Sequence, residues 1–227
     1  DLSYKKNIIL IFLIVLLKII LSFLTFGGGD ANNFASFYSL QYNDYDVYSI
    51  KSPYPYFPFA NFINVLIGQT ADLLNINFNN ILKLNAILFD FFIGYNIYLY
   101  SLEYSKNEDL SHRLFILYLL NPVTIFITCF LGFTDSIIIL LLIYCCRLNE
   151  FCKNKKFLIP IILSISVSIK PVCFVFFPYF FFNSNRRIIF LIISVFTFLI
   201  LNSFYFLNFD NIENLIWLLK YIFFKIT

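Results

Sequence analysis

Long apolar runs recur along the whole of this 227-residue chain, and they constrain its fold more than any other feature. Hydrophobic residues make up 60% of the sequence and charged residues 13%, whereas a soluble domain is nearer half apolar and a quarter charged. A helix needs about 20 apolar residues to cross a bilayer. The chain is therefore predicted to be an all-α, polytopic integral membrane helical bundle, with one transmembrane domain over 1–227. The runs cover roughly 7–26, 57–74, 81–100, 114–131, 136–148, 157–182 and 188–207.

Composition narrows the class of protein further. The chain starts at Asp1, contains no Met and ends within an amphipathic stretch, so we expect a fragment of a longer protein. No small-residue cleavage site follows the first run, which indicates a retained helix. A net charge of only +3 argues against nucleic acid as a partner. The cysteines lack metal-ligand spacing with the single histidine, which favours packing thiols.

The basic residues predict which side of the membrane each loop faces. They flank the first run, occupy the predicted loops 101–113 and 149–156, and end with Arg186 and Arg187 in loop 183–187. The positive-inside rule places all of these on the cytoplasmic side if segment 57–74 does not cross. That segment carries one narrow polar stripe, which favours a helix lying at the interface. A spanning helix that faces a polar cavity is the alternative. The stripe is Asn61, Asn64, Gly68 and Asp72.

Segment 157–182 is interrupted at Lys170–Pro171. Each half is about 20 Å long as a helix, too short to span alone. A re-entrant hairpin with Lys170 at its tip satisfies the charge rule, whereas a single long kinked helix would put the Arg186–Arg187 pair outside. With the hairpin, Asp30, Asp135 and Lys170 all lie on the non-cytoplasmic side, around an outward-facing cavity.

Residues 27–57 form the predicted first external loop, with Asp30 directly behind three glycines. The carboxylate would then stand at the membrane edge, although a cap for a short helix from Ala31 is the competing interpretation. The loop is rich in tyrosine, which anchors at membrane interfaces and also stacks on sugar rings. Asp44 and Asp46 could serve a metal, but a solvated loop face explains them more simply.

Other ionisable residues lie within or beside the apolar runs, where they usually mark a site or a buried pair. Lys83 and Asp90 are seven residues apart and share one helix face, so they either form part of a site or pair with other helices. Asp135 follows a turn and would suit a helix N-cap as well as a site. Lys170 would either snorkel to the interface or hold an anion.

Several motifs occur in a fixed order: "GGGD", "DVY", "SPYPYFP", a helix with Lys83 and Asp90, "LLNPVTIF", "GFTDS" and "SIKP". Over about 20–180, this order resembles the GT-C glycosyltransferases that use polyprenyl-phosphate sugars. It is most similar to the dolichyl-phosphate-mannose-dependent mannosyltransferases that begin the GPI glycan, and to their prokaryotic relatives.

The resemblance implies roles for individual residues. The family's catalytic acid, often the last residue of Asp-x-Asp, falls on Asp30, while the first acid falls on Gly28 and is missing. Because of this departure, the sequence leaves open whether a divalent cation is bound. Substrate-binding positions fall on Tyr48, Tyr54, Tyr56, Lys83, Asp90, Asp135 and Lys170, and the loop adds Lys51.

The expected activity is inverting transfer of a sugar, with mannose favoured, from a polyprenyl-phosphate donor to a lipid-linked or glycan acceptor. Asp30 would be the general base, and Lys170 with Lys51 would stabilise the leaving phosphate. The expected location is the ER membrane or a bacterial or archaeal plasma membrane. A small membrane subunit is a possible partner. A non-catalytic subunit that holds the lipid-linked substrate and a small-solute transporter remain as alternatives.

Overall fold

The computed structural model describes residues 2–43, 56–132, 135–152 and 155–206, and every regular element among them is a helix. The expected all-α class is therefore confirmed for these residues. The chain divides into two compact units, and each is described here by itself. Unit 1 comprises residues 1–35 and 67–152, and unit 2 comprises 36–66 and 153–227.

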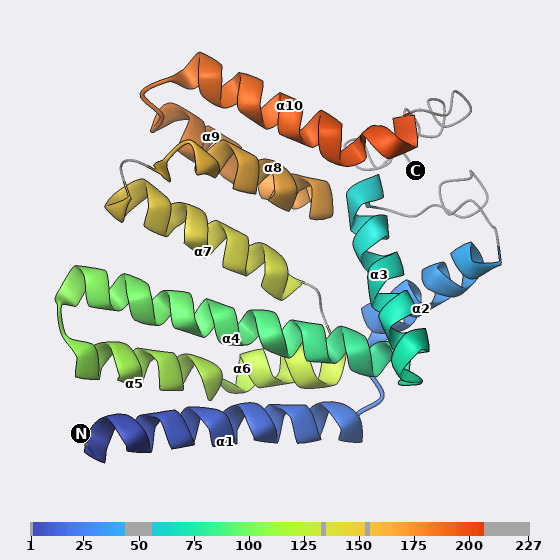
Figure 1. Ribbon diagram of the computed structural model, residues 1–227, viewed down its shortest axis with the longest axis vertical. Coiled ribbons are helices and arrows are strands. Elements are labelled where there is room, and N and C mark those ends of the chain that lie inside the picture. The colour runs from blue at the N-terminus through green and yellow to red at the C-terminus, as the bar shows by residue number, and fades with distance from the viewer. Residues whose placement is uncertain (1, 44–55, 133–134, 153–154, 207–227) are drawn as a thin grey trace. The chain divides into compact units, whose positions relative to one another are not determined.

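Unit 1 is a set of packed helices centred on α4 (Figure 1). Helix α4 packs against α1, α5, α7 and the π-helical segment η1, and α1 also packs against α5. Helices α2 (Gly29–Tyr42) and α3 (Pro58–Leu74) each run across the boundary between the units. The elements of unit 1 are α1 (Leu2–Leu24), α4 (Phe78–Ser105), α5 (Glu108–Leu119), α6 (Pro122–Ile125), η1 (Phe126–Leu131) and α7 (Asp135–Phe151).

Two helices among the described residues are long and apolar enough to cross a membrane. They are Lys6–Leu24 of α1 and α4, which correspond to the predicted segments 7–26 and 81–100. A third span is present if α5 and Pro122–Leu131, which meet at a bend of 44°, are counted as one. Membrane association is thus supported by length and composition, and the full multi-pass topology stays a prediction.

The predicted loop 101–113 is wrong. Helix α4 continues to Ser105 and α5 begins at Glu108. Lys106 ends α4 in the left-handed conformation, at φ 57°. The Asn107 side chain accepts a hydrogen bond from Leu110 N, which caps α5. The polarity of this segment therefore marks exposed helix ends, because polar residues are tolerated there as readily as in a loop.

The apolar core of unit 1 lies where α1, α4 and α5 meet. Ile14, Phe115 and Leu119 are at least 95% buried and pack with Phe91 and Tyr98. The Phe91 and Phe115 rings meet edge to face, with centroids 5.6 Å apart. This arrangement is the favourable one for aromatic pairs, so the core combines burial with a directional contact.

Unit 2 contains α8 (Leu158–Ile169), η3 (Pro171–Phe176), α9 (Phe177–Phe182) and α10 (Arg187–Phe206). Lys170 has extended backbone angles between α8 and η3, and the chain then folds back along α8 (Figure 1). The predicted hairpin shape is therefore confirmed, and the single kinked helix is wrong. Pro171 explains the position of the break, because a proline disfavours helical angles in the residue before it.

Helices α8 and α10 of unit 2 are joined by buried polar contacts. Ser164 Oγ donates to Ser194 O at 2.9 Å, and Asn202 Nδ2 donates to Ser168 Oγ at 3.1 Å. Asn202 Oδ1 also accepts from Phe59 N at 3.2 Å. Small residues allow close approach of helices in lipid, and their hydroxyls then bridge the pair.

The polar stripe of α3 faces protein for most of its length. Asn61, Asn64 and Gly68 are buried, whereas Asp72 is exposed. Asn61 Nδ2 donates to Gln41 Oε1 at 2.9 Å. The first three members of the stripe are thus covered by the chain itself, and whether α3 lies at a membrane interface stays a prediction.

We expect Gly94→Ala to destabilise unit 1. A Cβ atom at this position would lie 2.6 Å from Phe115 Cε2 on α5, so the ring must move. Overpacking of this kind costs about 1–3 kcal/mol. The free energy of unfolding in detergent measures the effect, and Leu88→Ala, at a half-exposed position of the same helix, is the control. A Gly94→Ala protein as stable as the parent would contradict this packing.

Candidate functional site

The turn after α1 places the predicted catalytic acid. Gly27 has φ +87°, so the chain leaves α1 sharply, as the glycines lead us to expect. Gly28 N then donates to Leu131 O at 3.0 Å. Helix α2 begins at Gly29, so Asp30 lies in its first turn. The predicted external loop 27–57 thus contains a helix in its first half, as the competing interpretation expected, although that helix begins at Gly29 and not at Ala31.

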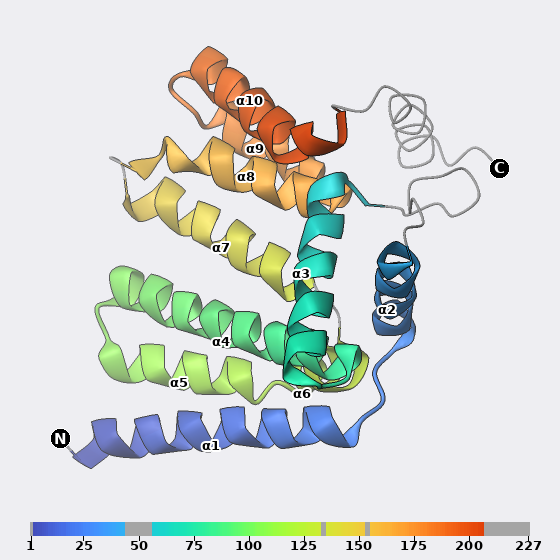
Figure 2. The ribbon, with the colours of Figure 1, turned by 45° about the vertical axis from the view of Figure 1, so that its right-hand side comes forward.

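Leu131, which accepts the hydrogen bond from Gly28 N, ends the π-helical segment η1. The next residue is Gly132, whose φ of +69° requires the left-handed conformation. Helix α7 begins at Asp135, so this carboxyl group belongs to the first turn of a helix, where negative charge is favourable. Figures 1 and 2 show the ends of α1 and of the α6–η1 segment and the start of α2 together at one end of unit 1. The backbone segments that lead toward Asp30 and Asp135 therefore meet at Gly28 and Leu131.

At the same end of unit 1, Lys83 of α4 forms hydrogen bonds with Ser22 and Thr25 at the end of α1. It is fully buried, and its ammonium group donates to Ser22 O, to Thr25 O at 2.5 Å and to Thr25 Oγ1 at 3.1 Å. Thr25 Oγ1 in turn donates to Cys129 O at 2.6 Å. The last carbonyls of a helix lack partners within it and attract cations. An ammonium group has three donors, and the acceptors on Ser22 and Thr25 can take all of them, so Lys83 connects α4 to the end of α1.

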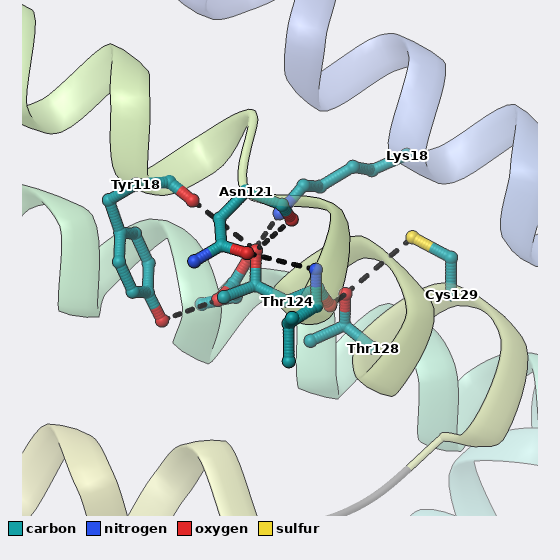
Figure 3. Close-up of polar contacts among 8 residues, drawn as sticks. Lys18, Tyr118, Asn121, Thr124, Thr128 and Cys129 are labelled. Atoms are coloured by element: carbon teal, nitrogen blue, oxygen red, sulfur yellow. Dashed lines mark hydrogen bonds and ion pairs between the residues drawn. The ribbon is translucent and has the colours of Figure 1, made fainter.

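Asp90 is also engaged with its neighbours. It forms an ion pair with Lys18 of α1, and both side chains are about 99% buried. Tyr118 Oη donates to the other carboxylate oxygen at 2.7 Å. Figure 3 shows Lys18 and Tyr118 converging on this point from α1 and α5. Lys83 and Asp90 thus share one face of α4, as predicted, and both pair with α1.

Lys18 and Tyr118 were missed by the sequence analysis. Lys18 is the one charged residue within the apolar run 7–26, and that isolation is the signal that would have identified it. Its partner lies 72 residues away, so only the fold reveals the pair.

The polar groups at the break between α5 and α6 form hydrogen bonds with nearby residues. Asn121 Oδ1 accepts from Val123 N at 2.9 Å and so caps α6. Thr124 Oγ1 donates to Asn121 O at 3.0 Å, and Thr128 Oγ1 donates to Thr124 O at 2.7 Å (Figure 3). Pro122 brings no N–H to the break, so it leaves no donor unpaired there. The bend is therefore compatible with a nonpolar environment.

The remaining predicted site residues belong to unit 2 or fall outside the described residues. Lys170 and Tyr56 are half-buried and belong to unit 2. Tyr48, Lys51 and Tyr54 fall outside the described residues, as do Asp44 and Asp46. The thiols of Cys129, Cys145 and Cys173 are buried. Within the described ranges, no group of three His, Cys, Asp or Glu residues is placed to hold a metal ion.

No family model, curated protein sequence or solved structure matches this chain.

We expect Gly28→Asp to destabilise the protein instead of restoring the acid pair. A Cβ atom at Gly28 would lie 3.1 Å from Leu131 Cα and 3.2 Å from its carbonyl oxygen, where backbone cannot easily move. The expected loss is about 1–3 kcal/mol of unfolding free energy. Asn33→Asp adds a carboxyl group at an exposed position of α2 and is the control. A stable Gly28→Asp protein with new metal dependence would overturn this account of the turn.

Removing either charge of the Lys18–Asp90 pair should destabilise unit 1 strongly. Asp90→Asn leaves the Lys18 ammonium buried without a counter-charge, at a cost of about 3–5 kcal/mol. The double variant Lys18→Met/Asp90→Leu should recover most of that loss, because no charge then stays buried.

The Arg147–Glu103 pair, whose side chains are 18% and 29% exposed, is the more exposed control for this prediction. Its Nη2–Oε1 distance is 2.7 Å, and Glu103→Gln should cost about 1 kcal/mol or less. Reversible unfolding in detergent measures all three variants. If Asp90→Asn behaved like Glu103→Gln, the buried pair would not stabilise the unit.

Proposed function

We propose that the chain is a membrane glycosyltransferase that moves a sugar, with mannose favoured, from a polyprenyl-phosphate donor to a hydroxyl of a lipid-linked or glycan acceptor. One observation supports this most: the hydrogen bond from Gly28 N to Leu131 O brings together the turns that lead to Asp30 and Asp135. Both turns lie at one end of unit 1, beside the end of the candidate span α1.

The proposed reaction inverts the anomeric carbon. Asp30 accepts the proton of the acceptor hydroxyl as its oxygen attacks that carbon, and the bond to the phosphate oxygen breaks on the opposite side. Asp135 orients the acceptor. Lys170 and Lys51 neutralise the charge that grows on the leaving phosphate, a role suited to a compact ammonium group.

Gly28 explains why the proposal relies on a single acid in the first turn. A side chain there would meet the Leu131 backbone, so close packing of the two turns requires the glycine that replaces the family's first acid. In this proposal the first turn lacks a second carboxylate because a side chain at Gly28 would prevent its contact with Leu131.

The contacts of Lys83 and Asp90 give little support to the transporter alternative. Lys83 donates to the carbonyl oxygens of Ser22 and Thr25, and Asp90 accepts from Lys18 and Tyr118. An ion relay would need at least one of these groups to exchange partners during transport. Solute flux into proteoliposomes that contain the purified chain tests that alternative directly.

We expect Asp30→Asn to lower the transfer rate by 100-fold or more, because loss of a general base typically removes a factor of 10²–10⁴. The assay uses the purified protein, a radiolabelled polyprenyl-phosphate mannose donor and a lipid-linked acceptor. Asp109→Asn removes an exposed acid from the first turn of α5 and is the matched control.

The outcomes separate the enzyme from a non-catalytic subunit. Activity of the parent protein and of Asp109→Asn, with loss in Asp30→Asn, supports the enzyme. Equal activity of all three would refute Asp30 as the base. Donor binding by a parent protein that never transfers the sugar would identify a lipid-holding subunit instead.

A further inference from the structure

A cavity of about 420 Å³ lies in unit 2, apart from the candidate site. It is bounded by α8, η3, α9 and α10, with Phe174, Phe177, Leu191, Val195 and Phe198 among its walls. None of its lining residues is charged, and Ser164 and Ser194 are its only hydroxyl-bearing members. Ser164 Oγ is engaged with Pro160 O and Ser194 O. The cavity therefore offers an almost purely apolar surface to whatever fills it.

A second hollow, of about 710 Å³, lies at the turn between α9 and α10 and is basic. Arg186 and Arg187 line it with Ser184 and Asn185, and both arginines are exposed. Arg187 Nη2 donates to Phe182 O at 3.4 Å, which leaves most of its five N–H donors available. Paired guanidinium groups of this kind suit a phosphate group.

The two hollows follow each other along the same helices. Ile188 of α10 borders the basic one and Leu191, about one helical turn further on, borders the apolar one. From Leu191 to Leu199 the apolar cavity extends about 12 Å along α10. A ligand that spans both must carry an anionic head joined directly to a hydrocarbon chain.

We propose that unit 2 binds an anionic phospholipid of the membrane, with its phosphate at Arg186 and Arg187 and one acyl chain in the apolar cavity. The outer surface of α10 is itself apolar, with Ile192, Phe196 and Ile200 more than half exposed, so lipid chains are the molecules expected around it. The positive-inside rule places the arginines in the cytoplasmic leaflet, where anionic lipids attract basic residues. This site goes beyond the proposed sugar transfer and does not depend on it.

The test measures lipid binding by the purified full chain with native mass spectrometry. The probes are phosphatidylglycerol and phosphatidylcholine with identical acyl chains. The parent protein should bind phosphatidylglycerol about 30-fold more tightly, because each of the two arginines contributes about 1 kcal/mol near an anionic headgroup. The double variant Arg186→Gln/Arg187→Gln should bind both lipids equally, and equal binding of both lipids by the parent would overturn the proposal.

A matched pair of variants tests the cavity. Val195→Trp fills it and should reduce phosphatidylglycerol binding about tenfold or more, whereas Phe196→Trp changes an exposed neighbour outside the cavity and should have no effect. Equal binding by the two would refute the acyl-chain site.

Photocrosslinking keeps the test valid if a variant fails to fold. The unaltered chain with phosphatidylglycerol that carries a diazirine in its acyl chain should give adducts within 174–177 and 191–199, and adducts elsewhere would overturn the proposal. Polyprenyl phosphate is the competitor, and displacement at equal concentration would assign the cavity to the sugar donor. Because Asp30→Asn should still bind lipid, failure of the lipid site and failure of the proposed enzyme are distinguishable.

Discussion

The buried ammonium group of Lys83 is the contact on which the end of unit 1 depends. It neutralises the carbonyl end of α1, and through Thr25 it reaches the last turn of η1. Its aliphatic stem also limits the neighbouring turn, because a Cβ atom at Gly132 would lie 2.9 Å from Lys83 Cγ. One lysine therefore fixes where α1 stops and how closely η1 approaches α4, and these two features determine where the acid-bearing turns begin.

Part of the helical framework could be predicted from the sequence, because the apolar runs 7–26 and 81–100 reach the length that a helix needs to cross lipid. The face shared by Lys83 and Asp90 followed from their spacing alone, and the reversal at Lys170 followed from Pro171 and charge bias. Local signals of this kind need no knowledge of the partner helix.

The rest depends on contacts between distant segments. The loop over 101–113 was mispredicted because polar residues occur equally in loops and at exposed helix ends. The pairing of Lys18 with Asp90 could not be predicted, because the two residues are 72 positions apart in the sequence. Meeting of the Gly28 and Leu131 backbones could not be predicted from either segment, since it arises from the packing of α1 and η1 on α4. The candidate site was thus predicted as a set of residues, and its geometry required the fold.

The Lys18–Asp90 pair has a consequence for biosynthesis. Lys18 is translated 72 residues before its partner, a delay of about 4–14 s at ordinary elongation rates. During that interval α1 would enter a bilayer with an uncompensated charge, at a cost of about 2.5–3.5 kcal/mol on insertion scales. Arrival of α4 removes this penalty. If both helices cross a membrane, insertion of α1 would therefore be completed by α4, and the two would enter the bilayer as one unit.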